Sequence, residues 1–299
     1  MTDTASGAPA VAHFRFFTFE VLRTLRLGHS FLRVTFGGES LADFRSGGYD
    51  QSLSLFLPPA GQEHTVLPST DEDTWFASWR GMPEAERPVM RSYTVRGQRR
   101  TDEGAVEVDI DFVLHGDSSP ASHWAGRAVP GRRILAIGPA VAANKSVRFQ
   151  APATADAVWM YADETALPAA AAILERLPES AAVRAWFEVP HEDDRLGLAA
   201  PAGAEITWIV REDGGPKRSE RVLEALRAAE PLAAQAPYVW LAGEAGTIRA
   251  VRRHFVQERS VDRRSVRFTG YWRLGASEEQ LLAEAYAGKA PSEDPASEL

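Results

Sequence analysis

The sequence predicts two domains of different class: an N-terminal antiparallel β-barrel and a C-terminal α/β domain with a parallel sheet. In the first half, short apolar strands follow one another with turn residues between them and little helix, which is typical of a small barrel. In the second half, apolar strands alternate with helical segments, which favours a parallel sheet covered on both faces. We expect the barrel domain at residues 13–145 and the α/β domain at 155–286, with disordered ends at 1–12 and 287–299.

The barrel strands are marked by β-branched and aromatic residues. The strand from Val106 to Leu114 alternates apolar and polar side chains, which is the period of a half-buried strand. Trp75 and Trp79 are spaced to share one face of a short surface helix. The strands of this domain are expected at residues 16–22, 31–36, 53–57, 91–96 and 105–114.

The second domain is expected to begin with an apolar strand at 158–162 that leads through a turn into a helix. Further strands are expected at 182–189, 205–210 and 238–242. The helices are expected at 169–177, 220–229 and 247–258, with a shorter one at 278–286.

Composition excludes several classes of function. The 299 residues carry a formal net charge of −8, which argues against general nucleic-acid binding. There is no apolar run long enough for a membrane helix, and the first twelve residues do not resemble a secretory signal. With no cysteine, a disulfide, a thiolate-held zinc and a conventional iron–sulfur cluster are all excluded. We therefore expect a cytoplasmic protein, and an organic cofactor or haem if it transfers electrons.

The strand containing Arg91-Ser92-Tyr93-Thr94 is the first candidate for a binding site. Alternate side chains of a strand share a face, so Arg91 and Tyr93 point one way and Ser92 and Thr94 the other. A guanidinium beside a phenol suits a ligand that is anionic at one point and flat at another. The alternative is an ordinary surface strand with a solvated arginine.

A second candidate follows the last barrel strand, where Gly116 permits a turn and Ser119-Pro120 begins a helix. Amides at such a helix start favour an anion, and Ser118, Ser119 or Ser122 could add hydroxyl donors. Alternatively, Ser119 only caps the helix. No metal site is expected here, because His115 and His123 are eight residues apart and have no carboxylate at ligand spacing.

In the second half, neither standard phosphate-binding loop is present. The first strand instead runs into Asp163-Glu164-Thr165, and the strand at 238–242 runs into Gly243-Glu244-Ala245. Thr165 could cap a helix or donate to a phosphate, and the acidic pair suits ribose hydroxyls or the helix dipole. Arginines then gather toward the C-terminal end, as a patch for an anionic small ligand or as a solvated helix face. They are Arg249, Arg252, Arg253, Arg259, Arg263, Arg264 and Arg267.

Four stretches carry a resemblance to one family. Residues 83–96 contain the R-x-Y-[ST] tetrad; residues 115–125, 162–169 and 240–275 follow in the same order, the last ending in Gly270-Tyr271-Trp272-Arg273. Together they resemble the siderophore-interacting proteins, which are FAD-containing ferric-siderophore reductases of the ferredoxin-reductase-like superfamily. Two positions depart from the family pattern: Ser119 stands where a glycine is common, and Ala140 where an arginine is frequent.

The resemblance implies roles for individual residues. FAD would lie along the barrel, with Thr94 near the flavin N5 edge as the catalytic residue, and the pyridine nucleotide would enter at the second sheet. The implied FAD contacts are Arg91, Ser92, Tyr93, Thr94, Asp109, His115, Gly116, Ser118, Ser119, Ala121 and Ser122. The implied nucleotide contacts are Asp163, Thr165, Gly243, Glu244 and Ala245. The implied siderophore contacts are Arg249, Arg252, Arg253 and Arg273.

The implied function is electron transfer from NAD(P)H, or from ferredoxin, through FAD to a ferric siderophore, by a monomer. Arg211, Lys217 and Arg218 are the candidates to bind a 2′-phosphate, so NADH and NADPH both stay open. One alternative is a flavin or ferredoxin-type reductase on the same fold, with the arginine patch docking an acidic redox protein. The other is a non-enzymatic protein that sequesters a siderophore.

Overall fold

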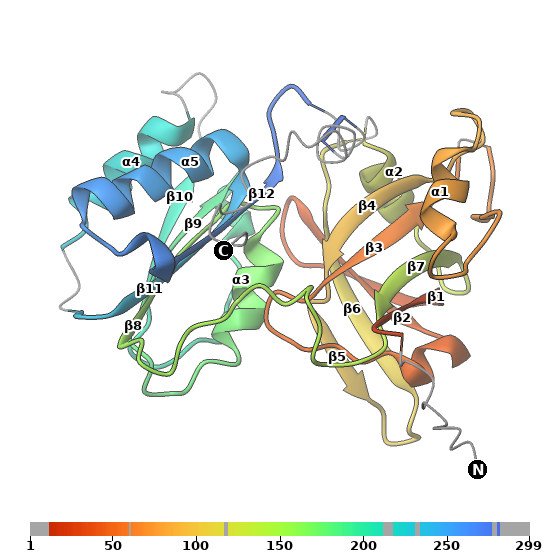
Figure 1. Cartoon of the computed structure of the whole chain (residues 1–299), viewed down its shortest axis with the longest axis horizontal. Helices are drawn as coiled ribbons and strands as arrows, with labels where there is room; N and C mark the ends of the chain where they lie inside the picture. Colours follow the sequence, from red (N-terminus) through yellow and green to blue (C-terminus); the bar gives the residue numbers. More distant parts are fainter. Residues whose placement is uncertain are drawn as a thin grey trace, which may run out of the picture.

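The computed structural model describes residues 12–59, 61–116, 119–211, 218–230, 234–276 and 280–281. They form two sheets that lie side by side in one molecule (Figure 1). The expected disorder at 1–11 and 287–299, and most of the helix expected at 278–286, fall outside the described residues. None of the helices within them is long and apolar enough to cross a lipid bilayer.

The first sheet is antiparallel, and its strands lie in the order β4-β3-β7-β1-β2-β6-β5. It curls so strongly that β4 returns toward β6, where the rings of Tyr93 and Phe112 lie 4.5 Å apart. The strands are β1 (Phe14–Arg26), β2 (Phe31–Gly37), β3 (Ser52–Leu57), β4 (Val89–Thr94), β5 (Gly97–Arg100), β6 (Val106–Val113) and β7 (Arg133–Pro139). Three short helices accompany them: η1 (Glu39–Asp43), α1 (Trp75–Arg80) and α2 (Pro120–Gly126).

The second sheet is parallel, in the order β10-β9-β8-β11-β12. Helix α3 (Leu167–Leu174) packs on one face, and α4 (Arg218–Ala228) and α5 (Ala245–Arg253) pack on the other (Figure 1). The strands are β8 (Ala157–Ala162), β9 (Val183–Val189), β10 (Glu205–Val210), β11 (Pro237–Glu244) and β12 (Val266–Trp272). The remaining turns are η2 (Glu192–Asp194), the π-helical η3 (His254–Glu258) and η4 (Arg263–Ser265).

The predicted fold class is confirmed, with three differences in detail. The strand expected at 91–96 ends at Thr94, because the chain there leaves β3 and crosses to β6, where the Arg96 amide donates to the Asp109 carbonyl. The helix expected at 247–258 ends at Arg253 and continues as the π turn η3. Strands β5, β7 and β12 were not predicted; β12 lies at the sheet edge and is only half buried, so its apolar pattern is weak.

The two domains share packed surface. Phe31 of β2 is fully buried in the apolar cluster that also holds Met160 and Phe187 of the second sheet. At the same seam the amide of Ser30 donates to the buried carboxylate of Asp194 at 2.7 Å. The relative position of the two sheets therefore rests on buried contacts and not on the connecting segment alone.

Candidate functional site at the seam between the two sheets

The Arg91–Thr94 segment forms the second half of β4, the edge strand of the first sheet. The Tyr93 ring packs on Phe112, while Arg91 is half buried and donates to the carbonyl of Met90 at 2.9 Å. Thr94, at the last position of the strand, is only 6% exposed. Two residues further on, Arg96 donates to Glu175 at the end of α3 at 2.8 Å, so the chain after the tetrad meets the second domain.

The turn after β6 lies beside this strand. The His115 amide donates to the Ser122 hydroxyl at 3.0 Å, so buried Ser122 fixes the turn. Gly116 has a φ of +76° and open space where a side chain would project. Ser119 precedes α2 but its side chain makes no capping bond, which leaves its hydroxyl available; Ser118 lies outside the described residues.

Asp109 is placed differently from the other predicted cofactor contacts. Its carboxylate accepts from the Thr35 hydroxyl at 2.7 Å and pairs with Arg99, on the opposite face of β6 from Phe112. It belongs to a row of carboxylates on this face, together with Glu107 and Asp111, each paired with arginine. Since Phe112 faces Tyr93, the Asp109 side chain points away from the tetrad.

The carboxyl edge of the second sheet holds a buried network of charges. Asp163 and Glu164 follow β8, and Glu188 lies near the end of β9; all three are at most 3% exposed. Arg211 grips Glu164 with two hydrogen bonds of 2.7 and 2.8 Å. Arg218, at the start of α4, bonds Glu188 and Glu164 at 2.8 Å each. Both guanidiniums therefore already have carboxylate partners.

Burial and this pairing set the ionisation of the network. Burial, reinforced by the neighbouring charge of Glu164, raises the pKa of Asp163 to about 6. Although burial opposes its charge as well, the hydrogen bonds from Arg211 hold the pKa of Glu164 below its ordinary value. Burial beside Glu188 raises the pKa of the Tyr161 hydroxyl well above its ordinary value, so Tyr161 donates to that carboxylate at 2.7 Å.

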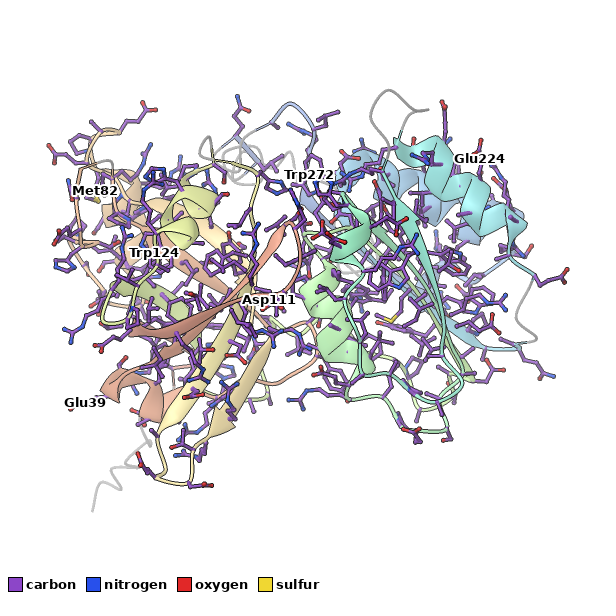
Figure 2. All side chains as sticks on the ribbon, turned by 180° about the vertical axis from the view of Figure 1, so that it is seen from behind. Glu39, Met82, Asp111, Trp124, Glu224 and Trp272 are labelled. Carbon is purple, nitrogen blue, oxygen red and sulfur yellow. The ribbon has the colours of Figure 1, made fainter. Side chains whose placement is uncertain are left out.

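Asp163 connects the charged network to three neighbouring segments of the chain. It accepts from the Trp272 indole at 2.9 Å, from the Glu244 amide at 2.8 Å and from the Thr165 hydroxyl at 2.6 Å. The Arg218 guanidinium lies 5.1 Å from the Trp272 ring centre. The indole N–H is therefore bonded to Asp163 while the face of the ring lies against Arg218. Trp272 lies at the seam between the two domains (Figure 2).

The turn after β11 approaches Asp163 so closely that only glycine fits. Gly243 has a φ of +144°, and a β-carbon there would lie 2.6 Å from the Asp163 carboxyl group. Glu244 then caps α5 by accepting from the Thr247 amide at 2.7 Å. The predicted nucleotide contacts Asp163, Thr165, Gly243, Glu244 and Ala245 therefore meet at one edge, at the point where the strand order reverses between β8 and β11.

Comparison with known proteins identifies the family. Residues 20–143 match the siderophore-interacting FAD-binding domain, and residues 155–275 match the siderophore-interacting protein model. The chain is 30% identical to the ferric vibriobactin reductase ViuB of Vibrio cholerae, over 89% of this chain and 93% of that protein. It is also 30% identical to the NADPH-dependent ferric-chelate reductase of Escherichia coli, over 86% of this chain and 93% of that protein.

The comparison with solved structures supports the same family. The crystal structure of a siderophore utilization protein from T. fusca superimposes with a TM-score of 0.74 at 34% identity, covering 89% of this chain and 95% of that one. The chain belongs to the siderophore-interacting protein family. This confirms the predicted family, and the match to residues 20–143 confirms the expectation of an FAD-binding first domain.

The residues at the seam fit an FAD molecule in such a siderophore-interacting protein. A diphosphate needs donors and close backbone approach, which Arg91, the uncapped Ser119 and the open Gly116 turn can supply. Tyr93 offers a partly exposed ring for a flat group, and Thr94 offers a hydroxyl. Flavin chemistry supplies hydride acceptance and single-electron donation, and these residues would bind and orient it. The individual contacts remain predictions.

The four arginines predicted to bind substrate are not brought together. Arg273 directly follows β12, at the same edge as Asp163 and Trp272. Arg249 is exposed on α5, whereas Arg253 is exposed at the far end of that helix, and Arg252 packs over the Phe268 ring at 4.7 Å. Within α5, residues 252 and 253 lie about 12 Å along the axis from Glu244. Arg273 is therefore the best placed of the four.

The sequence analysis missed Glu188 and the pairing of the two arginines. Glu188 is the one charged residue in the otherwise apolar run Ala185–Val189, and a lone carboxylate in a buried strand was the available signal. Arg211 and Arg218 are two of the candidates to bind a 2′-phosphate, but in the structure both guanidiniums bind carboxylates. Lys217 lies outside the described residues.

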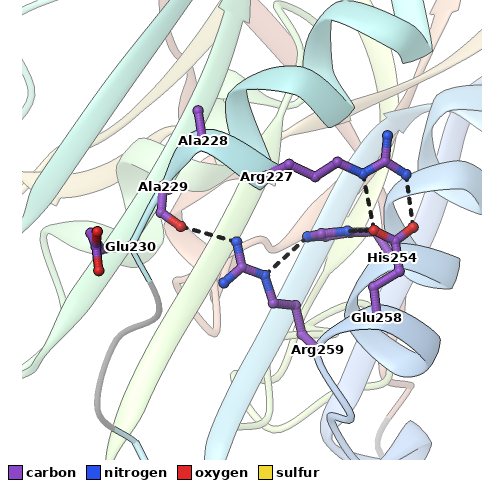
Figure 3. Close-up of a pocket in the computed structure, with 7 residues that line it drawn as sticks. All are labelled: Arg227, Ala228, Ala229, Glu230, His254, Glu258 and Arg259. Carbon is purple, nitrogen blue, oxygen red and sulfur yellow. Dashed lines mark hydrogen bonds and ion pairs between the residues drawn. The ribbon is translucent and has the colours of Figure 1, made fainter.

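A separate pocket of about 420 Å³ lies between the end of α4 and the π turn η3, at the amino edge of the sheet (Figure 3). Most of its charged groups are already bonded: Glu258 accepts from Arg227 and from His254, and Arg259 donates to the carbonyls of Leu226 and Ala229. These bonds close the C-terminal end of α4. The pocket is thus accounted for by the packing of α4 against η3.

Proposed function

We propose that this protein is an FAD-dependent ferric-siderophore reductase that takes electrons from NAD(P)H. The observation that carries the proposal is that the flavin-motif strand ends at the seam: Arg96, two residues after Thr94, donates to Glu175 at the end of α3 at 2.8 Å, and Trp272 and Asp163 lie bonded to each other at the carboxyl edge of the second sheet. A hydride acceptor on the barrel and a hydride donor on the sheet would face each other there. The related proteins named as ferric-chelate reductases support the same reading.

The overall reaction balances as NAD(P)H plus two Fe(III) giving NAD(P)⁺, two Fe(II) and a proton. Fe(II) binds hard oxygen ligands more weakly than Fe(III), so the siderophore would release its iron after reduction. No side chain is required as a nucleophile. The protein would bind the diphosphate through Arg91 and Ser119, orient the reactive edge through Thr94, and attract the anionic chelate through Arg273.

The direct test is to purify the protein, record its visible absorption, and follow Fe(II) with a ferrous chelator. NADH, NADPH and reduced ferredoxin should be compared as donors, and a ferric siderophore with ferric citrate as acceptors. We expect FAD absorption bands and Fe(II) release with a pyridine nucleotide. A colourless protein that binds no added FAD would contradict the proposal, and ligand binding without turnover would favour a siderophore-sequestering protein.

Arg91→Ala tests the assignment of the diphosphate. Loss of a charge-assisted contact is expected to weaken FAD binding about 10- to 100-fold in a fluorescence titration. Arg133→Ala is the control, because Arg133 is an exposed barrel arginine paired with Glu20 at 2.9 Å. Equal FAD affinities of the two variants would count against this placement.

A cytoplasmic location and a monomeric state complete the proposal. Cell fractionation and light scattering of the purified protein would check them. Membrane recovery or a stable dimer would revise these two points without touching the activity.

A further inference from the structure

A small inner pocket lies behind the π turn η3, on the face of the second sheet that α4 and α5 cover. Phe255 of η3 stacks on Trp159 of β8 with ring centres 5.5 Å apart, and its ring centre lies 6.3 Å from that of Trp186 of β9. Together with the end of α4, these side chains surround a volume of about 10 Å³, about the space of one water-sized group. Because π turns are rare and often lie at functional sites, this pocket is a candidate binding site.

Both indoles that line the inner pocket bring a donor without an acceptor. Trp159 is 7% exposed and Trp186 is 3% exposed, and neither Nε1 has a hydrogen-bond partner among the described residues. The indole of Trp79, which is also buried, instead donates to the carbonyl of Pro88 at 2.9 Å. A buried donor left unpaired costs about 1–3 kcal/mol. Two such donors beside one cavity indicate that a group with acceptor atoms fits there.

The charged side chain closest to the indoles in the sheet is bonded elsewhere. Arg184, which pairs with Trp159 in the register of β8 and β9, donates to the carbonyl of Glu230 and forms an ion pair with Glu205. An indole N–H only donates, so neither an arginine nor a second indole can satisfy it. Since the described lining leaves both donors without an acceptor, the acceptor has to come from a molecule that enters the pocket.

The inner pocket adjoins the pocket of about 420 Å³ between α4 and η3, which we call the outer pocket (Figure 3). Four residues line both: Ala229, Glu230, His254 and Arg259. The bonds that close the end of α4 account for the charged groups of the outer pocket, but none of them reaches the two indoles. A volume of the size that small ligands occupy therefore lies beside two unpaired donors.

The charges around the two pockets favour an anionic acceptor. The lining residues include three arginines and two glutamates, namely Arg184, Arg227, Arg259, Glu230 and Glu258. The carbonyls at the end of α4 oppose an anion, but Arg259 donates to two of them and so offsets their partial charge. A carboxylate only accepts and has two oxygens, which matches the two indole donors.

We propose that the inner pocket binds the carboxylate of a small organic acid, with Trp159 and Trp186 as its donors and the body of the acid in the outer pocket. This site lies toward the amino edge of the second sheet, whereas the predicted nucleotide contacts lie at the carboxyl edge. The inference therefore goes beyond the proposed function and does not rest on it.

The indole N–H signals of the protein report on this site directly. The sequence has eight tryptophans, and each gives one indole signal in a proton–nitrogen correlation spectrum. The probe is sodium acetate, which replaces sodium chloride at constant ionic strength. We expect the signals of Trp159 and Trp186 to shift together and to saturate below about 100 mM acetate. The Trp79 signal is the internal control and should stay in place, because that indole already has its acceptor.

Two variants assign the signals and test the donors. Trp159→Phe and Trp186→Phe each delete one signal, and each should weaken acetate binding at least about tenfold, since the carboxylate loses one of two donors. Trp208→Phe is the matched control, because Trp208 packs against Phe187 on the opposite face of the sheet. It should leave the affinity for acetate within about twofold of wild type. If one variant does not fold, the other variant and the wild-type titration still decide the question.

Acetamide separates charge from shape, because it has the size of acetate but is neutral. We expect it to bind at least about tenfold more weakly than acetate. Equal affinities would overturn the assignment of an acid. If neither indole signal shifts with acetate, the pocket holds a buried water only and the proposal fails. None of these measurements needs FAD or a ferric chelate, so their outcome is independent of the reductase activity.

Discussion

The carboxylate of Asp50 accepts a 3.0 Å hydrogen bond from the indole of Trp240, although the two residues are 190 positions apart in the chain. Its other oxygen accepts from the amides of Arg148 and Phe149, at 2.9 Å each. One side chain thus ties a loop of the first domain, the connecting segment and strand β11 together. Asp50 is 3% exposed, and burial raises its pKa above the ordinary value.

Asp50→Ala is therefore expected to destabilise the protein by about 3 kcal/mol, since two buried donors and one partly buried donor lose their acceptor. Urea unfolding followed by tryptophan fluorescence measures this change. Asp102→Ala, in an exposed turn, is the control and should change the free energy of unfolding by less than about 0.5 kcal/mol. A loss below about 1 kcal/mol for Asp50→Ala would show that water replaces the carboxylate.

Gly243 lies at the carboxyl edge of the second sheet, where we predict that the pyridine nucleotide binds. Gly243→Ala combines a φ of +144° with a β-carbon 2.6 Å from Asp163, so both backbone and side chain must shift. We expect a loss of at least about 3 kcal/mol in stability, or a folded protein that binds NAD(P)⁺ at least tenfold more weakly. Calorimetric titration with the oxidised nucleotide checks the second outcome.

Gly104→Ala is the matched control for this variant. Gly104 also has a positive φ, +84°, but nothing lies within 4 Å of a β-carbon added there. Only the backbone cost of about 1 kcal/mol is expected. Equal effects of the two substitutions would mean that the contact with Asp163 is easily relieved.

The sequence predicted what depends on local pattern. Val106–Phe112 alternates apolar and acidic residues, and β6 formed there. Asp163 and Gly243 both follow predicted apolar strands, and parallel strands bring such turns to one edge. What it could not predict depends on partners distant in the chain. Arg211 and Glu164 are 47 positions apart, and neither position alone shows that they pair.

The same distinction holds for Tyr271 and for the arginine patch. Tyr271 stood in a motif of the resemblance, but the bulge that makes it an extra residue on β12 shows only when that strand pairs with β11. Clustering of arginines in the sequence says nothing about where along α5 each one falls. Arg252 and Arg249 differ by three positions, yet Arg252 packs over Phe268 while Arg249 faces solvent.

Removing the ion pair between Arg211 and Glu164 should lower the free energy of unfolding, because Glu164 is only 3% exposed. Arg211→Met is expected to lower the free energy of unfolding by about 2–3 kcal/mol, somewhat less than for an isolated buried pair because Arg218 remains at 2.8 Å. Adding Glu164→Gln should restore part of the loss, since the stranded charge is then removed. Thermal unfolding at two salt concentrations measures both variants.

The comparison pair for this experiment is Arg195 and Glu192, which are spaced i,i+3 and exposed on the surface. Arg195→Met should change stability by no more than about 0.5 kcal/mol. An Arg211→Met protein that is equally tolerant would show that the network at the carboxyl edge is hydrated and replaceable.

Asp163 predicts a distinctive pH dependence of stability. Its pKa in the folded protein is about 6, against an ordinary value of 3.8, because burial disfavours its charge. Between these values the folded state binds a proton that the unfolded state has released. The free energy of unfolding contributed by Asp163 therefore falls as pH rises from about 4 to about 6 and is constant above that range.

Asparagine cannot titrate, so Asp163→Asn should lack this fall. A shift of about two pKa units corresponds to about 3 kcal/mol, and the wild type should lose roughly that much relative to the variant between pH 4 and pH 7. Urea unfolding at half-unit pH intervals gives both profiles, and Asp102→Asn, in an exposed turn, serves as the control with a profile parallel to wild type. If the Asp163→Asn profile is also parallel to wild type, Asp163 is ionised throughout this range. Arg218 and the Trp272 indole would then stabilise the charged carboxylate more strongly than burial destabilises it.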